Sequence, residues 1–122
     1  MLTHAVDRGV LVVTTGVDID IDISNRAFVA QNIARLVRSH LPLPVVLVLA
    51  APVVSSAALS AVLRVHRMCS GLGVPLAVVT PSAAARLVLR ASGGTTRFPL
   101  GVFAAAESAI TAVSTTAHDT SA

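Results

Sequence analysis

The sequence contains no lysine, tryptophan or tyrosine, and only 2% of its residues are aromatic. All nine basic residues are therefore arginines, and they are spread along the chain rather than gathered in one run. Proteins that bind nucleic acid combine clustered basic residues with aromatic side chains on which bases stack. The lack of both features argues against direct nucleic-acid binding, despite a formal net charge of +3.

Cysteine is almost absent, because Cys69 is the single one and no disulfide can form within the chain. It falls in an apolar helical pattern and is expected to be a small core residue rather than a nucleophile. The four histidines show no metal-ligand spacing, and no P-loop, dinucleotide-binding or nucleophile-elbow motif occurs. The sequence therefore predicts no metal, no cofactor and no catalytic residue.

Long hydrophobic runs are also missing, although 54% of the residues are hydrophobic and the mean hydropathy is +0.81. The longest run, residues 41–54, is too short to span a bilayer and contains three prolines. The first residues do not follow a signal-peptide pattern. We expect a cytoplasmic protein without membrane contact, folded as one domain over residues 1–113 and followed by a disordered tail over residues 114–122.

Two kinds of apolar segment alternate along the chain. Strands are predicted at residues 10–15, 45–49, 76–79 and, less regularly, 98–103, and residues 2–6 are compatible with an edge strand. The strand at 45–49 is apolar throughout and is expected to be buried. Helices are predicted at residues 25–40, 56–70, 82–91 and 105–113. This alternation implies an α/β domain with a mostly parallel sheet of four or five strands and about four helices.

The first predicted helix has an apolar stripe formed by Val29, Ile33 and Val37, with Phe28 and Leu36 beside it. Asp22 and Ser24 are both suitable residues to cap the start of this helix.

The most informative segment is the passage from the strand at 45–49 into the helix at 56–70, because Ser55 and Ser56 lie at the start of that helix. Free backbone N–H groups and the positive end of the helix dipole meet there. An anion, or a phosphate attached to one of these hydroxyls, would be stabilised at this position. Both serines are also good N-cap residues, so capping is the simpler role.

A polar stripe continues along the same helix. Ser56, Ser60, Arg64 and Arg67 follow one another at spacings of four, four and three residues, which places them close to one face. Such a stripe is either a solvated face or a docking face, with two arginines for acidic groups on a partner.

The order of the predicted elements resembles that of a STAS domain, the fold of bacterial anti-sigma factor antagonists. Residues 16–22, GVDIDID, resemble the stretch before the first helix of that family. Residues 55–63, SSAALSAVL, resemble its serine motif, and residues 66–73 resemble the histidine, arginine and small-residue turn that follow.

In that family, the serine after an aspartate is phosphorylated by a partner that is both anti-sigma factor and serine kinase. The dephosphorylated form binds this partner and releases the sigma factor. The matching residue is Ser56, whereas Ser55 replaces the aspartate and Ala58 a glycine.

The resemblance implies a non-enzymatic anti-sigma factor antagonist that regulates transcription by partner switching, with Ser56 as its phosphorylation site. The partner would then contact the docking face formed by Ser55, Ser56, Ser60, Arg64 and Arg67. The oligomeric state stays open, a homodimer included.

Two other functions also stay open. Loss of the carboxylate at position 55 favours a degenerate STAS domain that no kinase modifies and that serves as a scaffold or a small-ligand sensor. A receiver-like or enzymatic domain would instead use Asp18, Asp20 and Asp22, which an extended segment places on one side. Carboxylates are the ligands that Mg²⁺ prefers. A receiver also needs an aspartate after the central strand and a later lysine, and this chain has neither, so a solvated acidic face is favoured.

If the three aspartates form a solvated face, millimolar MgCl₂ should leave the melting temperature unchanged. A specific site would stabilise the folded state by roughly 2.7 kcal/mol at a hundredfold excess over its dissociation constant. Thermal unfolding of the chain and of an Asp18→Asn, Asp20→Asn variant, each with and without MgCl₂, checks this. A saturable increase that the variant loses would instead support a receiver-like site.

Overall fold

The computed structural model describes residues 2–15, 25–92 and 99–121. Strands and helices alternate after an initial hairpin, as the sequence predicts. The elements are β1 (Leu2–Asp7), β2 (Val10–Thr15), α1 (Arg26–Ser39), β3 (Val45–Leu49), α2 (Ser56–Gly71), β4 (Leu76–Val79), α3 (Ala83–Ser92), β5 (Gly101–Phe103) and α4 (Ala106–Ser121).

The strands form one sheet whose spatial order, β1-β2-β3-β4-β5, is the order of the chain. β1 is antiparallel to β2, and every later pair is parallel. The predicted α/β class, with a mostly parallel sheet and four helices, is confirmed, and the architecture is consistent with a STAS-like fold.

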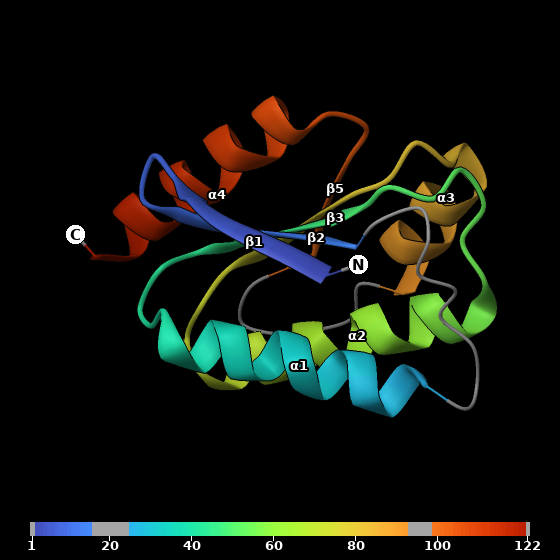
Figure 1. Ribbon diagram of the computed structural model, residues 1–122. Coiled ribbons are helices and arrows are strands. Elements are labelled where there is room, and N and C mark those ends of the chain that lie inside the picture. The colour runs from blue at the N-terminus through green and yellow to red at the C-terminus, as the bar shows by residue number, and fades with distance from the viewer. Residues whose placement is uncertain (1, 16–24, 93–98, 122) are drawn as a thin grey trace.

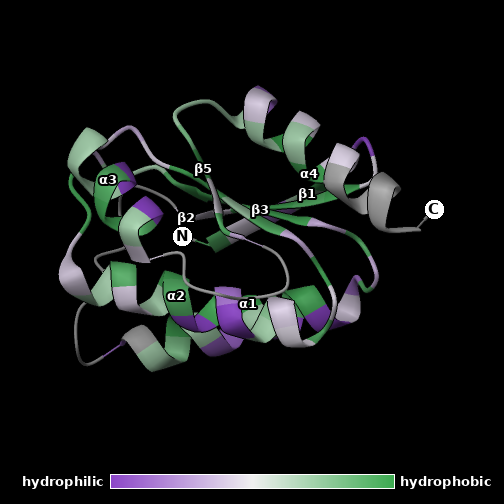
Figure 2. Cartoon of the chain, turned by 180° about the vertical axis from the view of Figure 1, so that it is seen from behind, coloured by the Kyte–Doolittle hydropathy of each residue, from purple (hydrophilic) through white to green (hydrophobic). Residues whose placement is uncertain are grey.

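Helices cover both faces of the sheet (Figure 1). α1 and α2 lie side by side on one face, and α4 lies on the other, as the view from behind in Figure 2 also shows. Val45, Leu47 and Leu49 of β3 belong to the core cluster under α1 and α2, whereas Val46 belongs to the cluster under α4. Successive residues of a strand point to opposite faces, so a strand covered on both faces must be apolar throughout.

The last helix is longer than predicted. α4 continues to Ser121, although the predicted helix ended at residue 113 and residues 114–122 were expected to be a disordered tail. The small polar composition of this segment is typical of a tail, but the Thr115 hydroxyl donates to the Thr111 carbonyl at 3.0 Å. Such a bond to the preceding turn lets a hydroxyl residue remain within a helix.

Two smaller predictions are corrected. Phe28 was placed beside the apolar stripe of α1, but its side chain is 68% exposed. The stripe of Val29, Ile33 and Val37 is buried, and its second flank is Ala30 rather than Phe28. Of the predicted last strand, 98–103, residue 98 lies outside the described residues, and within 99–103 only Gly101–Phe103 pair with β4.

The turn of the β1–β2 hairpin forms an ion pair with the first turn of α4. The turn residues Arg8 and Gly9 have φ values of 53° and 76°, so both adopt the left-handed conformation that two-residue hairpins favour. Arg8 Nη2 donates to both carboxylate oxygens of Glu107, at 2.9 and 2.8 Å, and Arg8 Nε donates to Asp7 at 3.2 Å. These hydrogen bonds raise the pKa of the Arg8 guanidinium, and the bond to Glu107 has the largest effect.

Within the described ranges, no helix is both long enough and apolar enough to cross a membrane.

Replacing Leu47 by Asp should lower the free energy of unfolding by about 3–5 kcal/mol, because it buries an unpaired carboxylate in the centre of the sheet. Val53→Asp is the matched control, since Val53 is 82% exposed and a surface change shifts stability by only about 0.5 kcal/mol. Urea unfolding followed by circular dichroism measures both. Equal stability of the Leu47→Asp variant and the parent would contradict the central position of β3.

Candidate functional site

The site predicted from the sequence lies where β3 passes into α2. β3 ends at Leu49, and a loop over residues 50–55 leads to the helix. Ser55 occupies the N-cap position in an extended conformation, with φ −73° and ψ 162°. Its hydroxyl oxygen accepts the N–H of Ala58 at 3.1 Å, and its carbonyl accepts the N–H of Leu59 at 3.0 Å. Ser55 is therefore the residue that caps α2.

Ser56 is the first residue of α2, and it is exposed. The next two residues, Ala57 and Ala58, are buried, so the helix turns its apolar side inward directly after Ser56. The two neighbouring serines thus have different positions. Ser55 closes the helix start, and Ser56 stands on the surface at the positive end of the helix dipole.

Four residues of the predicted docking face, Ser56, Ser60, Arg64 and Arg67, lie along α2. Arg64 and Arg67 are exposed, and Ser60 is partly buried. His66 of the same helix is buried and only 3% exposed. The structure therefore brings Ser56, Arg64 and Arg67 to the solvent side of one helix.

Sequence reasoning missed the loop in front of the helix. Val53 is 82% exposed and Pro52 is also exposed, so an apolar side chain stands on the surface close to Ser55. The signal was available: Val53 follows a proline between a strand and a helix, where neither the strand period nor the helix period assigns it to the core.

The other candidate groups of the sequence lie elsewhere. Asp18, Asp20 and Asp22, and the proposed caps Asp22 and Ser24, fall outside the described residues. Among the residues that the structure describes, no three His, Cys, Asp or Glu side chains come close enough to hold a metal ion.

Two histidines that are distant in the sequence do meet. The rings of His4 and His40 pack edge to face, with their centroids 5.4 Å apart. His40 Nδ1 lies 2.8 Å from the carbonyl oxygen of Leu36, at the end of α1. An edge-to-face pair is a packing contact between β1 and the end of α1, which the sequence spacing could not indicate.

Cys69 is fully buried in α2, and burial raises the pKa of its thiol to about 12. A thiol with this pKa is protonated at neutral pH, whereas the thiolate is the nucleophile. The expectation of a structural cysteine agrees with this placement.

The parallel strands end at the same edge of the sheet, where α2 and α3 begin. At the start of α3, Ser82 accepts the N–H of Ala85 at 3.1 Å, and buried Thr80 accepts the N–H of Ser82 at 3.2 Å. Because β2 to β5 follow chain order, the described sheet has no point where strand order reverses. Open α/β sheets bind ligands in the crevice at such a point. The described part of this edge instead consists of loops and the starts of α2 and α3.

Comparison with known proteins adds no family. No protein-family model matches the chain, and no curated protein is significantly similar to it.

Replacing Ser55 by Ala should lower the free energy of unfolding by about 1 kcal/mol, because the N–H of Ala58 loses its acceptor. Ser56→Ala is the matched control and should change stability by less than about 0.5 kcal/mol, since Ser56 is an exposed residue. Urea unfolding distinguishes them. A larger loss in Ser56→Ala than in Ser55→Ala would show that the roles of the two serines are reversed.

Proposed function

We propose that this protein is an anti-sigma factor antagonist, which binds an anti-sigma factor that is also a serine kinase and is switched by phosphorylation of Ser56. The observation that carries the proposal is the exposed position of Ser56 as the first residue of α2, next to a capping serine. The STAS-like order of strands and helices and the serine motif at residues 55–63 support it.

A phosphate on Ser56 is compatible with the fold. Ser55 already binds the N–H groups of Ala58 and Leu59. Helix geometry leaves the N–H groups of the first residues without partners in the helix, so a phosphate would turn to those of Ser56 and Ala57. The helix dipole favours its charge at this end. Phosphorylation would thus change the surface of the domain without unfolding it.

The helix start can keep its structure although Ser55 replaces the aspartate of the STAS motif. The family aspartate corresponds to Ser55, which is the N-cap of α2. Asp and Ser are both strong N-cap residues, so the serine keeps the helix start in place. What it does not supply is the negative charge beside the phosphorylated hydroxyl.

The surface around Ser56 has the composition of a docking site. Exposed Val53 supplies apolar area in front of the helix, and exposed Arg64 and Arg67 supply positive charge behind it. Phosphorylation would add about −2 charge to this surface, which opposes binding to an acidic patch on a partner. The proposal places the protein in the cytoplasm, together with the transcription machinery.

A second candidate rests on Ser55 itself. Without the carboxylate, the site could be one that no kinase modifies, and the domain would then act as a scaffold or a small-ligand sensor. Binding of the partner without phosphorylation is the behaviour expected of that alternative.

The test is to mix the protein with the candidate anti-sigma kinase of the same cell and ATP, and to map phosphate by mass spectrometry. We expect phosphate on Ser56, none in Ser56→Ala, and unchanged phosphorylation in Ser108→Ala, whose serine is exposed on α4. Ser56→Ala should bind the kinase constitutively, and Ser56→Asp should bind more weakly, with circular dichroism unchanged. Stable binding without phosphate would leave the antagonist role but remove the switch, and no binding would reject both.

A further inference from the structure

The charges on α1 and α2 have one sign. These two helices contain five of the nine arginines and no aspartate or glutamate. Arg35, Arg38, Arg64 and Arg67 are all exposed. In the described part of the chain, the acidic groups Asp7 and Glu107 both pair with Arg8, at the hairpin, and no described carboxylate pairs with any of these four arginines. The face formed by the two helices is therefore positive and uncompensated there.

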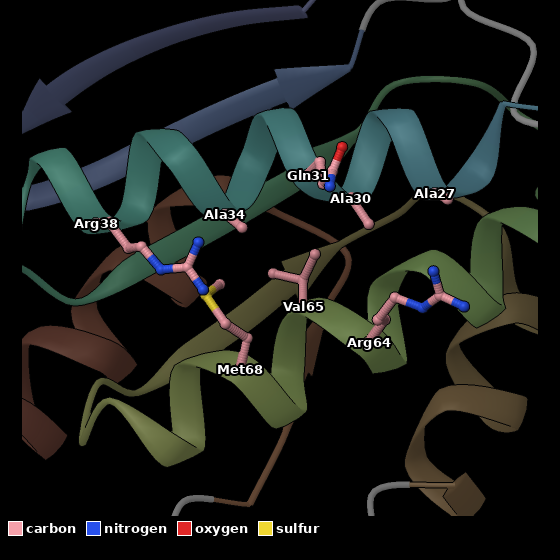
Figure 3. Close-up of a pocket in the computed structure, with 8 residues that line it drawn as sticks. All are labelled: Ala27, Ala30, Gln31, Ala34, Arg38, Arg64, Val65 and Met68. Carbon is pink, nitrogen blue, oxygen red and sulfur yellow. The ribbon is translucent and has the colours of Figure 1, made fainter.

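A groove of about 340 Å³ runs between α1 and α2 (Figure 3). Its walls are apolar and mostly small. Ala27, Ala30 and Ala34 come from α1, and Val65 and Met68 come from α2. Alanine side chains leave room above them, so the apolar side chains of a second molecule could contact the groove closely.

The groove is bordered by charge. Arg38 lies at one end and Arg64 at the other, with Gln31 between them (Figure 3). A second hollow next to it, lined by Arg35, Arg38 and Ser39 together with Gln31, continues the positive surface over α1. Apolar walls between guanidinium groups are complementary to a ligand with apolar side chains flanked by carboxylates.

The backbone of the two helices that line the groove favours one conformation of such a ligand. Both walls are helices, whose interior N–H and C=O groups are bonded within the helix. An extended peptide would find no strand edge to pair with, whereas a helix satisfies its own backbone. The groove has no aromatic wall on which nucleic-acid bases could stack. A protein helix fits these features better than either alternative.

We propose that the groove between α1 and α2 binds an acidic amphipathic helix of a partner protein, with Arg38 and Arg64 pairing with its carboxylates. Ser55, Ser56 and Arg67 do not line the groove, whereas Arg64 belongs both to the groove and to the predicted docking face. The inference does not require phosphorylation of Ser56. The groove is an interaction surface in addition to the start of α2.

The probe is a synthetic amidated peptide of about 18 residues, long enough to form a helix on binding. It carries leucines at i, i+4 and i+7 and glutamates on both flanks, which is the helix-in-groove pattern. The control peptide has lysine in place of every glutamate. Titration into the isotopically labelled protein, followed by NMR, gives the dissociation constant and the residues affected.

Binding of the glutamate peptide should perturb the signals of Ala34, Val65 and Met68. It should weaken about tenfold or more in Arg38→Glu and in Arg64→Glu, and less than about threefold in Arg67→Glu. The last variant has the same charge change on the same helix but lies outside the groove. Ala34→Leu should block the groove without any charge change, whereas Ala84→Leu, at an exposed position of α3, should not.

Several outcomes would overturn the inference. Equal binding of the lysine peptide, or equal losses in Arg64→Glu and Arg67→Glu, would show non-specific attraction to the positive face. Undiminished binding in Ala34→Leu would place the peptide elsewhere. Displacement of the peptide by a single-stranded oligonucleotide that perturbs the same signals would indicate a nucleic-acid surface instead. Failure of the kinase experiment with Ser56 would leave the peptide result unaffected, so the two proposals are separable.

Discussion

One constraint governs this structure: four parallel strands lie in the sheet in the order in which they occur in the chain. Each step from β2 to β5 moves in the same direction, and crossovers between parallel strands are almost always right-handed. The three crossover helices must therefore share one face of the sheet, and the core cluster on that face does contain residues of α1, α2 and α3. α4, which follows the last strand, provides the helical residues of the cluster on the other face.

The order of the strands also brings the arginines of α1 and α2 together. α1 and α2 become neighbours because the strands that they connect are neighbours, and their solvent sides together form one surface. That surface carries arginines, whereas the paired Asp7 and Glu107 lie at the hairpin and at the start of α4. Ser56 stands at the end of α2 that also receives the loop from β3. The order of the strands thus makes the arginines of α1 and α2 neighbours.

The parts of the fold that the sequence predicted are those with a strong local pattern. β3 is apolar at every position because both of its faces are covered, and the stripe of Val29, Ile33 and Val37 is buried as its spacing requires. The differences have physical causes: α4 accommodates polar residues such as Thr115, whose hydroxyl bonds to the preceding turn, and Phe28 lies just outside the buried arc of α1. In the candidate site, the sequence placed Ser55 and Ser56 at a helix start. It could not indicate which of them caps the helix, because both are serines and serine is a good N-cap residue. The ion pair of Arg8 and Glu107, 99 residues apart, and the groove between α1 and α2 depend on which elements become neighbours, which no local pattern contains.

Because the chain has no lysine, the positive charge on the surface of α1 and α2 comes from arginine side chains. A guanidinium group stays protonated throughout the physiological pH range, and it is not a substrate for the acylation that neutralises lysine amines. The positive charge of this surface therefore cannot be titrated away or removed by acetyl groups. It can be opposed by counterions, by the carboxylates of a bound partner or by a covalently attached anion, and the exposed hydroxyl of Ser56 at the start of α2 offers a place for the last.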